Sequence, residues 1–261
     1  MTLPGTPDPI HNNFTAGART PRTYADYRSA RRRSVWQQIG AVLLSPGAFF
    51  RALPPLGKTR QWLWVALLIL LLTGVSAVQQ QGGAATAESG PVAVPGAVEL
   101  SGDTGGADVS ARWTAALIAA SGLIVTWLLQ ALILGEASLL AGSAPSFSQN
   151  LHIVIWASVP LGLMAALQII YMLAGGTIGQ PGLAGLVAVL PGYADLPALL
   201  RAILTALAAR LTLFWLWGLA LTYLGLRHAL GVPRWAAAVS VGLWVGLAIL
   251  APVVMGALTG G

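Results

Sequence analysis

Residues 62–78 have the sequence WLWVALLILLLTGVSAV, a run of 17 residues without a charged side chain. About 20 apolar residues in a helix cross the roughly 30 Å hydrocarbon core of a bilayer, because each residue rises about 1.5 Å. The run and its flanking residues therefore predict a transmembrane helix. Long apolar stretches recur downstream, and four more spans are expected at about 113–141, 151–174, 203–226 and 235–258.

The composition of the whole chain also indicates a membrane protein. Of its 261 residues, 56% are hydrophobic and only 8% are charged, and the mean hydropathy is +0.74. Soluble domains carry about 25% charged residues, so this chain lacks the polar surface that a water-soluble globule needs. Disordered chains are poor in apolar residues, which excludes that class as well. The predicted fold class is an all-α membrane protein with five transmembrane helices and an N-terminal interfacial amphipathic helix.

The charged residues are distributed unevenly, and their distribution predicts the orientation in the membrane. Nine of the 14 lysine and arginine residues precede residue 61, whereas the low-complexity stretch 79–112 holds four acidic residues and one arginine. Positive charge is typical of cytoplasmic segments. We therefore expect a cytoplasmic N-terminus, a flexible outer loop at 79–112 and, after five spans, a C-terminus outside a bacterial cytoplasmic membrane.

The chain before the first span divides into two parts. Residues 1–34 are polar and aperiodic, which predicts a largely disordered basic arm. Residues 35–60 begin with VWQQIGAVLLSPGAFFRAL, in which apolar residues recur at helical spacing. Basic residues beside such a segment favour a membrane surface over nucleic acid as the partner, so 35–60 is expected to lie on the cytoplasmic leaflet. The expected lipid or partner contacts are Arg31, Arg32, Arg33, Trp36, Phe49 and Phe50.

Polar side chains within the spans are candidate functional residues, because burying them in a membrane is costly. They are Gln130 and Glu136 in the second span, Gln168 in the third and Arg210 in the fourth. Counted from the span ends, Glu136 and Arg210 lie in opposite leaflets, so no direct ion pair is expected. Arg210 and Gln168 share a level, which allows a hydrogen bond between them. The alternative is that Arg210 and Glu136 each extend to the nearer interface.

Two further signals are less specific. His152, at the start of the third span, is either a ligand for a haem or chlorophyll-type metal or an ordinary interfacial histidine that matches Glu136 in depth. Gly242 and Gly246 form a GxxxG pattern that permits close helix approach, within the fold or in a dimer.

Cysteine is absent, and no nucleotide-binding loop, nucleophile elbow or zinc motif occurs. We predict no catalytic residue, no metal site and no cofactor other than lipid.

Three short motifs have a recognisable arrangement around these spans. LLSPGAFF (43–50) precedes the first span, and GSAPSFSQN (142–150) precedes a span with an early proline, Pro160. Trp217, Leu221 and the pair Gly225-Leu226 end the fourth span. Over residues 35–258 this layout resembles the bacterial members of the Yip domain family, the Ypt/Rab-interacting-protein-like multi-pass membrane proteins. The long loop 79–112 departs from the family pattern.

The resemblance implies five spans behind a cytoplasmic N-terminal part and no catalytic residues to carry over. Eukaryotic members act in vesicle trafficking and membrane shaping with GTPase partners, which a bacterial member lacks. The expected function is therefore that of a non-enzymatic scaffold, assembly factor or membrane-organising protein, with lipids and other membrane proteins as partners. Two alternatives remain: an accessory subunit of a respiratory or photosynthetic complex, with pigment as a possible cofactor, and a small-solute transporter.

Overall fold

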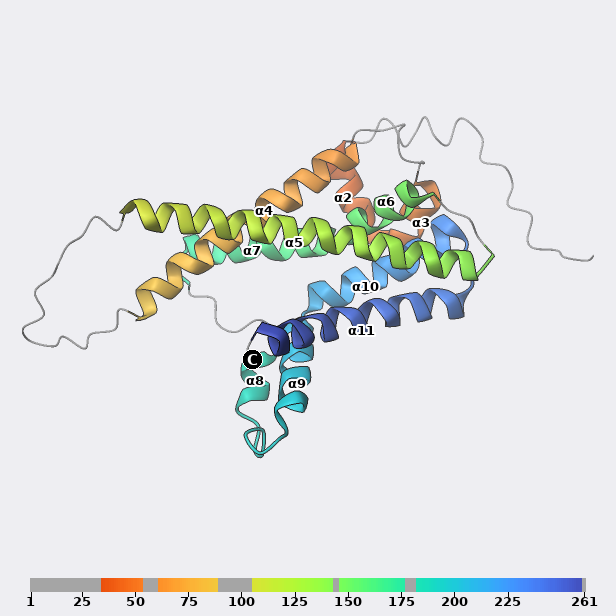
Figure 1. Cartoon of the computed structure of the whole chain (residues 1–261). Helices are drawn as coiled ribbons and strands as arrows, with labels where there is room; N and C mark the ends of the chain where they lie inside the picture. Colours follow the sequence, from red (N-terminus) through yellow and green to blue (C-terminus); the bar gives the residue numbers. More distant parts are fainter. Residues whose placement is uncertain (1–33, 54–60, 89–104, 143–145, 177–181, 260–261) are drawn as a thin grey trace, which may run out of the picture.

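The computed structural model describes residues 34–53, 61–88, 105–142, 146–176 and 182–259, and these residues are mostly helical, with no strand among them. Four segments are long and apolar enough to cross a membrane, and a pair of helices joined by a bend makes a fifth if it is counted as one span. Successive long helices alternate in direction (Figure 1). The predicted all-α membrane fold is confirmed. The four segments are Gln61–Gln79, Val109–Leu140, Phe147–Leu173 and Arg234–Val254.

The first two long helices extend beyond the spans predicted from the sequence. Helix α4 (Gln61–Glu88) and helix α5 (Gly105–Leu140) both continue into the stretch 79–112 that was expected to be a flexible loop. The sequence after the first span contains several Ala, Gln and Glu residues, which favour helix. The expectation of a loop is therefore wrong for both ends of this stretch, and residues 89–104 lie outside the described part.

Two short helices precede the spans. Helix α2 (Val35–Leu44) begins with a capping box, in which the Gln37 backbone N–H donates to Ser34 Oγ at 3.3 Å and the Ser34 N–H donates to Gln37 Oε1 at 3.0 Å. Helix α3 (Pro46–Ala52) begins at Pro46, whose fixed φ suits the first helical position. Gln38 in α2 donates to the side chain of Gln61, which ties this pair to α4.

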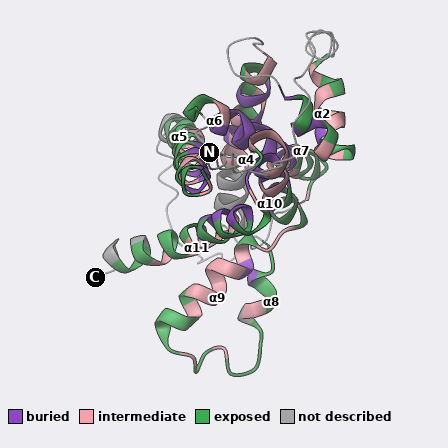
Figure 2. Cartoon of the chain, turned by 90° about the vertical axis from the view of Figure 1, so that its right-hand side faces the viewer, coloured by how far each residue is buried: buried purple, intermediate pink, exposed green. Residues whose placement is uncertain are grey.

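The third span is the centre of the structure. It consists of α6 (Phe147–Ala157) and α7 (Val159–Leu173), which meet at Ser158, just before Pro160. Of its most apolar window 56% is buried, against 28% or less for the other three spans. Figure 2 shows buried residues gathered around α6. Neighbouring helices α5 and α10 pack against α6, so this helix positions the side chains of most of the core.

The predicted fourth span, 203–226, is broken. Helix α9 (Ala198–Arg210) and helix α10 (Leu213–Gly225) meet at 80° instead of forming one continuous rod. The local reason is Thr212, whose Oγ1 accepts the Trp215 backbone N–H at 3.1 Å and so caps a new helix. The short helix α8 (Ala184–Ala188) packs on α9, and both project sideways from the long helices (Figure 1).

After α10 the chain forms a π-helical turn, η1 (Leu226–Leu230), and then helix α11 (Arg234–Thr259). The turn contacts α3 as well as α11, so α3, η1 and the start of α11 lie at one end of the bundle. Arg51, Arg227 and Arg234 therefore lie at the same end. The α9–α10 bend lies at the end of α10 away from η1, beside the middle of α5 (Figure 1).

Candidate functional site

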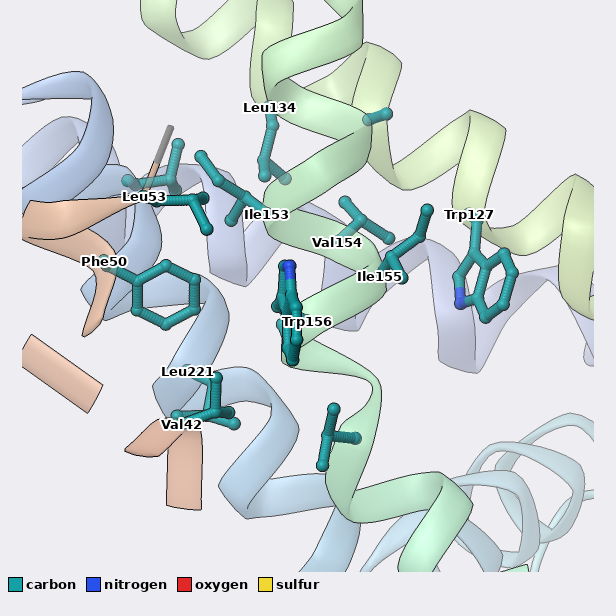
Figure 3. Packing of buried hydrophobic residues seen from close by; sticks show 14 of the residues in the cluster. Val42, Phe50, Leu53, Trp127, Leu134, Ile153, Val154, Ile155, Trp156 and Leu221 are labelled. Atoms are coloured by element: carbon teal, nitrogen blue, oxygen red, sulfur yellow. The ribbon is translucent and has the colours of Figure 1, made fainter. Parts of the chain in front are cut away.

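The motif segments noticed in the sequence converge at the end of the bundle that carries α3. Phe49 and Phe50 are 8% and 0% exposed, and the Phe49 ring meets the Trp156 ring edge-on at 4.9 Å between centroids. A Cβ placed on Gly225 would lie 3.4 Å from Phe50, so α3 lies directly against α10. Figure 3 shows Phe50 beside Trp156 and Leu221. We call this cluster the N-terminal dock: Phe49, Phe50, Ile153, Trp156, Leu221 and Gly225.

The dock corrects the prediction that Phe49 and Phe50 contact lipid or a partner. Both rings are buried inside the chain: Phe49 packs on Trp156, and Gly225, which has no side chain, lets Phe50 approach α10. The exposed apolar residues of this region are instead Trp36 and Leu44 in α2, which are 72% and 87% exposed. The predicted contacts Arg31, Arg32 and Arg33 lie outside the described residues.

His152 belongs to the edge of the dock. It is 2% exposed, and its ring lies between those of Trp62 and Trp156, with centroid distances of 6.5 and 6.4 Å. The histidine expected at an interface or on a bound cofactor is therefore part of an aromatic cluster. Glu136 lies at the same end but is exposed on α5, and the structure does not pair it with His152.

A second group of polar residues surrounds a cavity of about 50 Å³ near the α9–α10 bend. Two predicted residues, Gln130 and Arg210, line it together, although no sequence pattern indicated that they meet. The Gln130 side-chain N–H donates to Thr222 Oγ1 at 3.2 Å, and Arg210 is exposed beside the cavity. Residues that the sequence reasoning missed complete the lining, among them Trp127, Ser158, Thr222 and Trp215.

Within this lining, α5 and the α6–α7 junction are joined by a buried hydrogen bond. Trp127 Nε1 donates to Ser158 Oγ at 2.9 Å, and the Ser158 hydroxyl donates to the Val154 carbonyl at 2.9 Å. Both side chains are nearly inaccessible, at 4% and 5% exposure. The bond fixes the junction that precedes Pro160 to its neighbour helix.

We expect Trp127→Phe to lower the free energy of unfolding by about 1 kcal/mol, the typical size of an interhelical hydrogen bond in a membrane protein. A double-mutant cycle with Ser158→Ala, measured by reversible unfolding in mixed micelles, isolates this bond. The two changes should be less than additive, because each removes the same interaction. Fully additive losses would show that the bond contributes nothing to stability.

The remaining predicted residues are separated from both groups. Gln168 Oε1 accepts from Ser76 Oγ at 3.1 Å, which joins α7 to α4, and the hydrogen bond considered between Gln168 and Arg210 is not formed. A Cβ placed on Gly242 or Gly246 would have no atom of the described chain within 4 Å, so this GxxxG pattern does not mediate close packing there. Among the described residues, no group of three acidic or histidine side chains is arranged to hold a metal ion.

Several long apolar helices around a buried α6 define the chain as an integral, multi-pass α-helical membrane protein. The Yip1 domain model matches residues 40–255, from α2 to the last part of α11. The chain therefore belongs to the Yip1 domain family, as its motifs indicated. No curated protein and no solved structure shows significant similarity to it.

Proposed function

We propose that the protein is a non-enzymatic scaffold or membrane-organising protein that acts through its N-terminal helices. The supporting observation is the dock, which buries Phe49 and Phe50 and thereby holds α2 in place with Trp36 and Leu44 exposed. Arg51, Arg227 and Arg234 at the same end favour a cytoplasmic location for this surface, in a bacterial cytoplasmic membrane with the C-terminus outside. Its partners are membrane lipids and other membrane proteins, and it needs no cofactor.

The family match supports this proposal, because Yip domain proteins form a non-enzymatic family of membrane proteins. The shape of the surface supports it as well. Exposed aromatic and aliphatic side chains beside arginines suit an interface between a membrane surface and a second protein. A scaffold of this kind needs a surface held in a fixed position, and the buried dock holds α2, which carries Trp36 and Leu44.

We expect the double variant Trp36→Ala/Leu44→Ala to lose a stoichiometric companion that the unmodified full-length chain retains. The measurement is native mass spectrometry after extraction from the host membrane in a mild detergent. The matched control is Leu139→Ala/Leu140→Ala, which removes two exposed apolar side chains from the end of α5. A chain that is purified alone, or a companion that both double variants retain, would contradict the proposal.

A further inference from the structure

Arg210 carries a positive charge that no described part of its own chain neutralises. The cavity beside it is also lined by Leu123 and Trp244, which lie near the middle of the candidate spans Val109–Leu140 and Arg234–Val254. Its side chain is exposed there, and no carboxylate among the described residues forms an ion pair with it. A charge inside a membrane is costly without a partner, so a carboxylate from another molecule is expected beside Arg210.

The chain carries a carboxylate on a segment that projects from the bundle. Helices α8 and α9 and the turn between them, residues 184–210, form an arm that extends sideways from the long helices (Figure 1, Figure 2). Asp195 is exposed in the turn at the far end of this arm, and Arg210 is at its base. The other acidic residues of the described part belong to the ends of α4 and α5. Within one chain the length of α9, about 18 Å, separates the two charges, so Asp195 reaches Arg210 from a second copy.

The direction of α9 places both charges at a similar level of the membrane. Helix α9 meets α10 at 80°, and Ala198 and Ala209, near its two ends, line one groove with residues 252–257 of α11. The arm therefore crosses α11 instead of running along it. Two copies inserted in the same orientation are related by a two-fold axis along the membrane normal, and this axis makes their arms antiparallel. Antiparallel arms place the tip of each against the base of the other.

The exposed side of α9 suits this packing. Leu199, Ala202, Ala206 and Arg210 follow one another at three or four positions and so lie on one face of the helix. Leu199 is 64% exposed and Ala202 is exposed as well, which leaves this face open to a neighbour. Alanine between the charged ends lets two helix backbones approach closely. The groove between this face and α11 has a volume of about 720 Å³, which adds room for a neighbouring arm.

We propose that two copies of this chain associate through antiparallel α9 helices, with Asp195 of each copy paired with Arg210 of the other. One two-fold axis near Ala202 generates two identical ion pairs. Each pair neutralises two charges that a lone chain leaves exposed. Arg201 projects from the opposite side of α9 and takes no part. The N-terminal dock is not part of this interface, so this proposal and the proposed function can each fail without the other.

The test uses the full-length chain in lipid vesicles, with donor and acceptor fluorophores on two populations of the protein. Energy transfer, measured while added lipid dilutes the protein, gives the dissociation constant in the membrane. We expect Arg210→Asp and Asp195→Arg each to weaken self-association by about tenfold or more, because every dimer loses two ion pairs and gains two like-charge contacts. The matched control is Arg201→Asp, which makes the same change on the other face of α9 and should associate like the unmodified chain.

Mixing the two charge variants separates this pairing from other effects of the substitutions. A chain with Asp195→Arg and a chain with Arg210→Asp are complementary at both contacts. The mixture should therefore regain strong energy transfer between unlike chains, although neither variant associates with itself. No transfer in the unmodified chain, equal losses in Arg201→Asp and Arg210→Asp, or a mixture as weak as its components would each overturn the proposal.

A second measurement changes no charge and serves if a charge variant does not fold. Because the chain has no cysteine and Ala202 lies beside the proposed axis, Ala202→Cys should form a disulfide-linked dimer when an oxidant is added to the vesicles. The control is Leu139→Cys, an exposed position on α5 that the interface does not include. Equal cross-linking of the two variants, or none in Ala202→Cys, would refute the antiparallel contact.

Discussion

Replacing Phe50 by alanine is expected to release α2 and α3 from the bundle and to lower the free energy of unfolding by about 3 kcal/mol. Phe50 is fully buried in the dock, and truncating a buried phenylalanine costs about 3–5 kcal/mol through lost burial and the cavity left behind. We take the lower end because the surrounding bilayer is itself apolar. Unfolding in mixed micelles measures the loss, and limited proteolysis detects the released segment.

The control for this prediction is Trp36→Ala in the neighbouring helix. Trp36 is also aromatic but is 72% exposed, so its removal should change stability by no more than about 0.5 kcal/mol. Proteolysis of α2 and α3 should then proceed as in the unmodified chain. If Trp36→Ala and Phe50→Ala destabilise the protein equally, the dock does not hold the N-terminal helices.

The second large effect is expected at Gly225. A Cβ at this position would lie 2.4 Å from Ile153 Cγ2, an atom on the stiff, branched part of a fully buried side chain. Gly225→Ala should therefore lower the free energy of unfolding by about 1–3 kcal/mol through overpacking, although alanine itself favours helix by about 1 kcal/mol over glycine. Thermal unfolding in detergent, followed by circular dichroism, measures the change.

A matched pair separates the steric effect from helix propensity. Gly242→Ala introduces the same methyl group into a helix where nothing lies within 4 Å, so it should be neutral or stabilising. Ile153→Ala removes the opposing Cγ2, and its combination with Gly225→Ala should cost less than the sum of the two single changes. A stabilising Gly225→Ala variant would refute the close approach of α10 to α6.

The sequence was sufficient for the fold class and for four of the five spans, because long apolar runs are recognised by length and composition alone. The sequence did not predict the break within 203–226, because the same apolar composition is compatible with one straight helix and with two helices joined by a bend. Thr212 was the available signal: it is a good N-cap residue placed two positions after a charged arginine. The helical ends of 79–112 were missed because glycine and acidic residues were interpreted as a loop.

The candidate sites were harder to predict, since they depend on which helix faces meet. Counting residues separated Glu136 and Arg210 in depth; in the structure Glu136 is near the end of α5, and Arg210 lines a cavity with Leu123 and Trp127 nearer the middle of that helix. It could not place Gln130 beside Arg210, because α5 and α9 are far apart in the chain and the packing order is not encoded in any single segment. The burial of Phe50 likewise depends on Gly225, which lies 175 residues after it.

The 175 residues between Phe50 and Gly225 also determine how late α3 can dock while the chain is being synthesised. Helix α3 leaves the ribosome long before α6 and α10 exist, and at roughly 5–20 residues per second the interval from Phe50 to Gly225 lasts about 9–35 seconds. During this interval Phe49 and Phe50 have no dock to enter. We therefore expect the nascent segment to keep its two rings against the bilayer surface, as an interfacial helix, until α6 and α10 are made.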